Sequence, residues 1–195
     1  MNQQLRNIFE IMGATSRPWG FCGGWGLDLF LGRETRPHQD FDIAVFRQDQ
    51  KAVHEHLTAR SWTCRKVIDG NAVPWQKDEF NDLPCHEVWC HKASFDPPKF
   101  EMLLNESDRT HFIFRRDSSV RMPFDRAILK AACGLPVLAP EIILLYKSKD
   151  FESGNNVADF GKTVGQLDDD ARQWLRAALG RQDPQHPWLR NLGGE

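Results

Sequence analysis

Residues 23–46 read GGWGLDLFLGRETRPHQDFDIAVF, and this stretch decides the expected fold. An apolar run at residues 19–22 leads into the glycine pair, and the apolar residues that follow indicate a short helix ending at Gly32. A polar loop containing Pro37 comes next, and residues 41–46 have the β-branched and aromatic content of a central strand. The segment therefore predicts a strand, a glycine turn, a helix and a second strand, joined with few spare residues.

Two carboxylates, Asp40 and Asp42, stand at the start of this second strand. Residues two apart in a strand project to the same side, with Cα atoms about 7 Å apart. Two like charges held there repel unless one is protonated or a cation compensates them, and hard carboxylate oxygens suit Mg²⁺ or Mn²⁺. Two solvated acids at a strand end would give the same pattern, so the pair alone does not decide the function.

The glycine pair and the loop favour the metal interpretation. Gly23 and Gly24 allow backbone N–H groups to approach a ligand, and the N-terminus of the following helix favours anions. The loop adds positively charged groups at Arg33, Arg36 and His38. A phosphate-binding turn beside a metal-binding acid pair is what a nucleoside triphosphate with its metal requires.

Helices and further strands are expected on both sides of this stretch. Helices are expected at residues 5–12, 50–60, 140–150 and 168–179, and strands at residues 64–68, 86–91, 99–105 and 111–114. The last three strands indicate an antiparallel meander, and residues 153–156 look like a linker. The pattern predicts an α+β (mixed α/β) protein, in which a mixed sheet with flanking helices fills residues 1–135 and a small helical cap fills residues 136–195.

Composition restricts the partners. The 195 residues carry 25 Lys and Arg against 27 Asp and Glu, a formal charge of −2, so no global field attracts nucleic acid or an anionic membrane. No signal-peptide pattern or run of membrane-spanning length occurs, which favours a cytoplasmic protein. Five cysteines, an odd number, favour free thiols over a disulfide framework.

Some other clusters have simpler explanations. Cys85 and Cys90 would face opposite sides of a strand, so at most His86 and Cys90 share a face, which is too few ligands for structural zinc. No G-x-S-x-G turn of a serine hydrolase occurs. The basic pair in residues 115–117 (RRD) is followed at once by an acid, which is typical of a solvated turn.

Three charged residues later in the chain allow two interpretations each. Glu101 lies in the apolar run FEMLL, where a carboxylate costs several kcal/mol unless it is paired or bound to metal. A salt-bridged glutamate on an edge strand would satisfy the same requirement. Lys147 and Lys149 close an apolar helix, where lysines commonly complement the helix dipole.

Residues 23–46 closely resemble the motif of nucleotidyltransferases in the polymerase-β-like superfamily, in particular the aminoglycoside-2''-adenylyltransferase-like group, which also resembles the lincosamide nucleotidyltransferases. The shared signature is a glycine pair, an Asp, a GR-x-TR-x-H-x-D-x-D run and a hydrophobic strand, and every one of these positions is present. The later runs PEIILLYKSKD and HPWL are similar to the C-terminal part of that group. The resemblance implies the nucleotidyltransferase fold, with a mostly antiparallel sheet.

The resemblance also implies the metal site. Asp40 and Asp42 would bind two Mg²⁺ ions, and a third carboxylate on a neighbouring strand would complete the set. Glu101 is the best match by position, as a metal ligand or as general base toward the acceptor hydroxyl, and Glu87 and Glu106 are its alternatives. Many relatives carry Asp at this position.

The activity implied is transfer of a nucleoside monophosphate, AMP from ATP, to a hydroxyl of a small molecule such as an aminoglycoside-like antibiotic or a metabolite, with release of pyrophosphate. The glycine pair would donate backbone N–H groups to the nucleotide. Arg33, Arg36, Lys147 and Lys149 would neutralise its phosphates. Asn155 and Asn156 stand where relatives commonly have Lys and Asp. The alternatives are therefore a catalytically impaired nucleotide-binding protein, or a toxin-like enzyme acting on a protein or tRNA.

Overall fold

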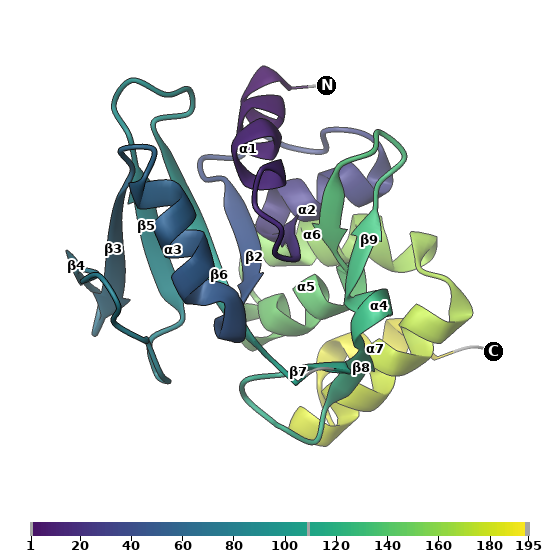
Figure 1. The fold of residues 1–195 in the computed structure, drawn as a ribbon. Helices are drawn as coiled ribbons and strands as arrows, with labels where there is room; N and C mark the ends of the chain where they lie inside the picture. Colours follow the sequence, from purple (N-terminus) through teal and green to yellow (C-terminus); the bar gives the residue numbers. More distant parts are fainter. Residues whose placement is uncertain (1, 109, 194–195) are drawn as a thin grey trace.

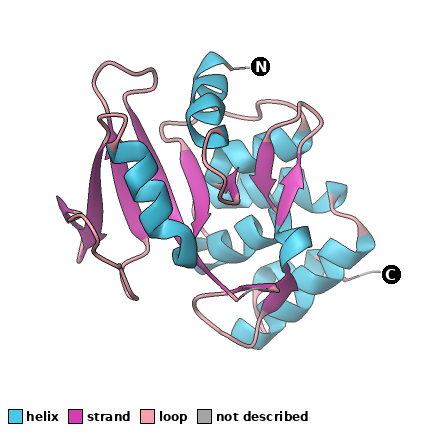
Figure 2. Cartoon of the chain, in the orientation of Figure 1, coloured by secondary structure: helices cyan, strands magenta, loops and turns pink. Residues whose placement is uncertain are grey.

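The computed structural model describes residues 2–108 and 110–193 of the chain. Strands run through the middle of the molecule and helices cover them on both sides (Figure 1, Figure 2). The helices are α1 (Gln3–Gly13), α2 (Gly23–Leu31), α3 (Gln50–Thr58), α4 (Phe124–Ala127), α5 (Pro140–Lys147), α6 (Gly154–Thr163) and α7 (Asp169–Gln182). The α+β class is thus confirmed.

The main sheet has the strand order β4-β3-β5-β6-β2-β1-β10-β9, and β7 and β8 extend the end of β6. The strands are β1 (Trp19–Phe21), β2 (Asp42–Phe46), β3 (Thr63–Ile68), β4 (Asn71–Pro74), β5 (Glu87–His91), β6 (Lys99–Ser107), β7 (His111–Ile113), β8 (Arg121–Pro123), β9 (Ile128–Lys130) and β10 (Pro136–Leu138). Only the pairs β2/β6 and β1/β10 are parallel among the described strands, so the sheet is mostly antiparallel.

Strand β2 lies between two hydrophobic cores because its side chains alternate in direction. Ile43 and Val45 join the core that contains apolar residues of α1 and α3. Ala44 and Phe46 join the core that contains apolar residues of α5 and α7. Both faces of β2 are therefore covered, and its first residue, Asp42, stands where this covered strand begins.

Most of the elements expected from the sequence are present. The antiparallel meander of β5, β6 and β7 is confirmed. The Asp168 side chain accepts a hydrogen bond of 2.8 Å from the Ala171 N–H at the start of α7, as expected of a capping residue. All five cysteines are free thiols. Over the described residues, no helix combines the length and the apolar character needed to cross a membrane.

Other local expectations are wrong. The segment 153–156 is not a linker, because α6 begins at Gly154. Asp49 does not cap α3 with its side chain, since residues 47–49 form a 3-10 turn that runs into the helix. Four short elements, β8, α4, β9 and β10, were not predicted from the sequence. The sheet extends past the predicted domain boundary at residue 135, because β10 begins at Pro136 and pairs with β1 and β9.

Candidate active site

The site is built around two carboxylates on neighbouring parallel strands. Asp42, the first residue of β2, lies in register with Glu101 of β6, and the Glu101 N–H donates a hydrogen bond of 2.8 Å to the Phe41 carbonyl. Registered neighbours point to the same face of a sheet, so both carboxylates lie on one face. Glu101 Oε1 accepts a hydrogen bond of 2.7 Å from Lys99 Nζ.

Negative charge is in excess around Asp42. The pKa of Asp42 is raised to about 6, first by burial and then by the neighbouring carboxylates of Glu101, Asp40 and Glu87, against the opposing effect of Lys147. Asp40 itself is exposed. A cation bound beside Asp42 would reverse this shift, because an opposite charge favours the ionised form.

The two glycines leave room for side chains of the protein itself. Gly23 has φ +60°, and a Cβ there would collide with the Asp42 carboxylate. A Cβ on Gly24 would collide with the His38 ring and the Arg36 guanidinium. The glycine pair therefore lets the acid and the loop cations approach the N-terminus of α2.

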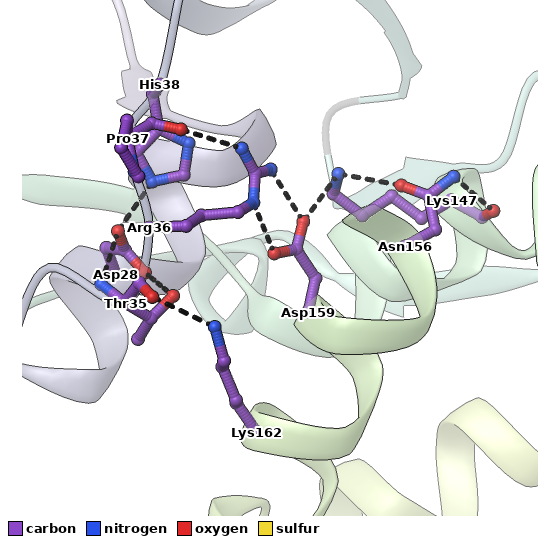
Figure 3. A network of polar contacts seen from close by, with 9 residues as sticks. All are labelled: Asp28, Thr35, Arg36, Pro37, His38, Lys147, Asn156, Asp159 and Lys162. Atoms are coloured by element: carbon purple, nitrogen blue, oxygen red, sulfur yellow. Dashed lines mark hydrogen bonds and ion pairs between the residues drawn. The ribbon is translucent and has the colours of Figure 1, made fainter. Parts of the chain in front are cut away.

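Asp28 anchors the loop that follows α2. This buried carboxylate accepts hydrogen bonds from Thr35 N (3.0 Å) and Thr35 Oγ1 (2.6 Å), and it lies 2.5 Å from His38 Nε2 (Figure 3). Lys162 of α6 donates a hydrogen bond of 2.9 Å to the Thr35 carbonyl. Asp28 is the Asp of the motif, but no role was predicted for it, because its partners come close only when the loop folds back over the helix.

Asp159 of α6 joins the loop to the C-terminal helices. Arg36 donates to both carboxylate oxygens of Asp159 at 2.9 Å, and Lys147 Nζ lies 2.9 Å from its Oδ2 (Figure 3). Burial opposes ionisation of Asp159, but the hydrogen bonds from Arg36 and Lys147 outweigh it and lower the pKa. One carboxylate thus offsets, in part, two of the four cations that the resemblance assigned to the phosphates, Arg36 and Lys147.

Asn156 also holds Lys147. Its Oδ1 accepts a hydrogen bond of 3.1 Å from Lys147 Nζ, and its Nδ2 donates to the carbonyls of Lys147 (3.3 Å) and Asp150 (2.9 Å). The position at which the sequence departs from its relatives is therefore a structural contact of the predicted phosphate-binding lysine.

A cavity of about 340 Å³ opens beside Gly23 and Lys147. Apolar side chains of β6, β10 and α5 form much of its wall, and Arg115 and Arg116 also line it. Residues 115–117 do lie in a turn and Arg116 is exposed, as expected, but both arginines also line the cavity that reaches Lys147. The other lining residues are Cys22, His86, Leu103, Leu104, Asn105, Leu138, Ile143, Tyr146 and Asn156.

The remaining predicted residues occupy several different places in the structure. Arg33 is exposed and lines a different cavity, together with residues of α1 and α2. Lys149 is exposed in the turn after α5. Of the alternatives to Glu101, Glu87 lies near enough to raise the pKa of Asp42, whereas Glu106 forms an ion pair of 2.5 Å with Arg47.

A divalent cation such as Mg²⁺ would need several oxygen ligands at this site. Across residues 2–108 and 110–193, no three His, Cys, Asp or Glu side chains form a ready-made metal cluster, and Lys99 occupies Oε1 of Glu101. The chemistry of the site nonetheless fits Mg²⁺, since its donors are carboxylate oxygens and the buried Asp42 carboxylate lacks charge compensation.

The fold defines the class of protein. The chain superposes on ANT(2'')-Ia in complex with adenylyl-2''-tobramycin with a TM-score of 0.63, at 14% identity over 93% of this chain and 99% of that one. The solution structure of ANT(2'')-Ia gives a TM-score of 0.60, at 16% identity over 94% of each chain. The lincosamide antibiotic adenylyltransferase LnuA with lincomycin bound gives 0.57, at 15% identity over 84% of this chain and 96% of that one. These similarities show a nucleotidyltransferase fold.

The sequence identifies the group within that class. The profile of the aminoglycoside-2''-adenylyltransferase family matches residues 4–95, which include both glycines, the loop and Asp42. No curated protein sequence matches the chain. Residues 4–95 therefore match the aminoglycoside-2''-adenylyltransferase family in sequence, and the chain has the fold of aminoglycoside and lincosamide nucleotidyltransferases, as the resemblance implied.

Proposed function

We propose that the protein transfers AMP from ATP to a hydroxyl of a small acceptor and releases pyrophosphate. The observation that carries this proposal is the Asp42 carboxylate, which is buried beside Gly23, in register with Glu101, with excess negative charge around it. A buried carboxylate with a raised pKa is costly, and such groups concentrate at functional sites. The match of residues 4–95 to the aminoglycoside-2''-adenylyltransferase family supports this reaction class.

Asp40, Asp42 and Glu101 are the residues that would hold Mg²⁺, as two ions, and Mn²⁺ suits the same oxygens. The metal would supply charge stabilisation at the reacting phosphate and a more acidic acceptor hydroxyl. The Glu101 carboxylate, once released from Lys99, takes up the hydroxyl proton. The acceptor oxygen then forms a bond to the α-phosphorus, the bond from this phosphorus to the bridging oxygen breaks, and pyrophosphate leaves.

The α-phosphate would lie at the N-terminus of α2. The backbone N–H groups of Gly23 and Gly24 and the ammonium of Lys147 would donate to it, and Arg36 would support this region from the loop. Gly23 and Lys147 line the same cavity. Asp159 keeps the two cations oriented while reducing their net charge. Arg33 and Lys149 are proposed as peripheral contributors, since both are exposed.

The acceptor is proposed to be an aminoglycoside-like or lincosamide-like antibiotic or a related hydroxyl-bearing metabolite. Two of the similar structures hold compounds of these kinds. A second cavity of about 290 Å³ is lined by Asp40, Lys99 and Glu101, next to the reacting groups. The acids around it favour a cationic acceptor through charge complementarity.

We further propose that residues 1–135, together with strand β10, which completes their sheet, form the catalytic part, and that the helices after β10 form a cap within residues 136–195. Lys147 and Asp159 would then reach the catalytic loop from the cap through Arg36. The reaction is assigned to the cytoplasm, where ATP is available and the free thiols would remain reduced.

The test is pyrophosphate release from ATP, GTP, CTP or UTP, measured with Mg²⁺ and a panel of antibiotics, hydroxyl-bearing metabolites and tRNA. Asp42→Asn is expected to lower the rate by about 100-fold or more, because it removes a charge aimed at the reaction centre. Asp169→Asn, an exposed acid at the start of α7, is the matched control and should leave the rate unchanged. An unchanged rate in Asp42→Asn would refute the mechanism.

The alternative of an impaired nucleotide-binding protein is supported by Asn156, which occupies a position where relatives commonly carry Asp and which holds Lys147. Calorimetry separates the two functions. Binding of ATP with Mg²⁺ but without pyrophosphate release for any acceptor would favour the impaired protein. A signal with tRNA alone would favour the toxin-like function, with a steep dependence on salt.

A further inference from the structure

The turn between β7 and β8 presents two adjacent arginines to the cavity beside Gly23. The Phe114 N–H donates to the Val120 carbonyl at 2.9 Å, and the Asp117 N–H donates to the Phe114 carbonyl at 3.0 Å. These bonds close the turn with Arg115 and Arg116 at its tip. Arg115 is half-buried and Arg116 is more exposed, and both line the cavity.

The two guanidinium groups lack a compensating carboxylate. Within the described part of the chain, neither forms an ion pair with Asp or Glu. Asp117, their neighbour in sequence, turns away and accepts hydrogen bonds from its own turn and from Gln182 of α7 (3.0 Å). Glu106 is paired with Arg47. The nearby acids are therefore occupied elsewhere.

An uncharged ring supports the pair instead. The carbon centres of the Arg115 and Arg116 guanidinium groups lie 5.3 and 5.5 Å from the centre of the Tyr146 ring. Burial raises the pKa of Tyr146 to about 12, so its phenol stays neutral. Partial burial and the neighbouring Arg115 lower the pKa of Arg116. Two like charges thus lie side by side, and an anion between them would be stabilised.

Phosphate is the anion that this arrangement suits. Arginine forks bind phosphate oxygens in pairs, and the same cavity reaches Lys147 and Gly23, where the α-phosphate of a nucleotide is proposed to lie. The charges of Arg36 and Lys147 are offset by their ion pairs with Asp159, whereas those of Arg115 and Arg116 are not offset by a described carboxylate. The cavity therefore becomes more positive away from Asp42.

We propose that Arg115 and Arg116 form the subsite for the β- and γ-phosphates of the nucleotide, and hence for the pyrophosphate that leaves. This inference rests on the proposed function for the position of the α-phosphate. The pair acts by binding and orienting the leaving group and takes no proton. The catalytic acids lie at one end of the substrate and this pair at the other.

The experiment measures the affinity of pyrophosphate, ATP and AMP by calorimetry, without an acceptor, for the wild type and for Arg115→Gln and Arg116→Gln. A charge-assisted hydrogen bond to a phosphate is worth enough to lower affinity about tenfold when removed. Each variant is expected to bind pyrophosphate and ATP about tenfold more weakly, with AMP binding within about twofold of the wild type. Arg176→Gln, at an exposed position of α7, is the control and should match the wild type.

Equal losses for AMP and ATP, or unchanged pyrophosphate binding, would overturn the inference. Arg115 makes no side-chain hydrogen bond to another described residue, so Arg115→Gln decides the test even if Arg116→Gln, which loses a contact with the Tyr146 carbonyl, fails to fold. Arg115→Lys should restore part of the affinity. Wild-type protein that binds as expected but transfers nothing would refute only the proposed function, and transfer with unaltered pyrophosphate binding in the variants would refute only this inference.

Discussion

Asp42 and Asp159 are both removed from water at least in part and both lie close to Lys147, yet their pKa values move in opposite directions. Burial and neighbouring acids raise the pKa of Asp42, which is half-buried, to about 6. Asp159 is the less exposed of the two, but Arg36 and Lys147 hold its pKa below the ordinary value. The difference comes from the partners rather than from the depth of burial, because an ion pair offsets desolvation only where the opposite charge is present.

The contrast separates two kinds of charged residue in one site. The charge of Asp159 is compensated within the protein by Arg36 and Lys147, and the carboxylate joins the loop at Arg36 to the C-terminal helices. The negative charge of Asp42 is not fully compensated by the protein, so the ionised carboxylate lowers the stability of the fold until a cation binds. A site of this kind gives up folding free energy for function, which is a common trade in enzymes.

Asp159→Asn should produce the largest change in stability. The substitution leaves Arg36 and Lys147 without their carboxylate in a half-buried place, and breaking a buried pair costs about 3–5 kcal/mol. Urea unfolding near pH 7 should show this loss, while Asp169→Asn on the surface stays within about 0.5 kcal/mol of the wild type. Because the pKa of Asp159 is lowered, its advantage is present above the ordinary value of 3.8 and fades as pH falls through the lowered pKa. A loss that does not change with pH would contradict the ion-pair explanation.

Asp42→Asn should act in the opposite direction and stabilise the metal-free protein. The folded pKa of about 6 lies above the unfolded value of 3.8, so the folded state holds the proton more tightly and stability falls as pH rises between these values. Two pKa units correspond to about 3 kcal/mol, which the variant should recover at about pH 8 and not at about pH 3. Unfolding in EDTA measures this difference in stability, with Asp169→Asn as the exposed control. A variant less stable than wild type at about pH 8 would show that Asp42 is already compensated.

The site also shows which contacts could be predicted from the sequence. The glycine pair, Asp42 and the hydrophobic strand lie close together in the chain, and local patterns of this kind predict local structure well. That Glu101 lies on a strand beside Asp42 was expected only from the resemblance, since these residues come from distant segments, and the parallel direction of the pair was not predicted. The apolar run around Glu101 predicted the strand itself but not its neighbour.

Contacts between distant segments escaped prediction. Asp159 and Arg36 are separated by most of the chain, and neither residue carries a local signal for the other. Arg115 and Arg116 looked solvated because Asp117 follows them, but the fold turns this acid toward α7. The segment 153–156 looked like a linker because its glycine and asparagines have low helix propensity, and packing of Phe160 in the core overrides it.

Gly23→Ala compared with Gly32→Ala tests how closely Asp42 approaches α2. Both glycines have positive φ, +60° and +71°, so both substitutions carry the cost of left-handed backbone. Only at Gly23 would the new methyl meet the Asp42 carboxylate, while Gly32 has nothing within 4 Å. Gly23→Ala should therefore be about 2 kcal/mol less stable than Gly32→Ala by thermal or urea unfolding. Equal costs would mean that Asp42 moves aside freely.

Arg36→Lys should give the smallest effect and shows how the compensation of Asp159 is divided. Lysine keeps the charge but cannot reproduce the two hydrogen bonds of 2.9 Å that the guanidinium donates. Because Lys147 still contacts Asp159, the loss should be about 1 kcal/mol, well below that of Asp159→Asn. Urea unfolding measures this loss against Arg176→Lys, at an exposed arginine that forms no ion pair with a described carboxylate. A loss as large as that of Asp159→Asn would assign the whole compensation to the Arg36 fork, and Lys147 would then be free to bind phosphate.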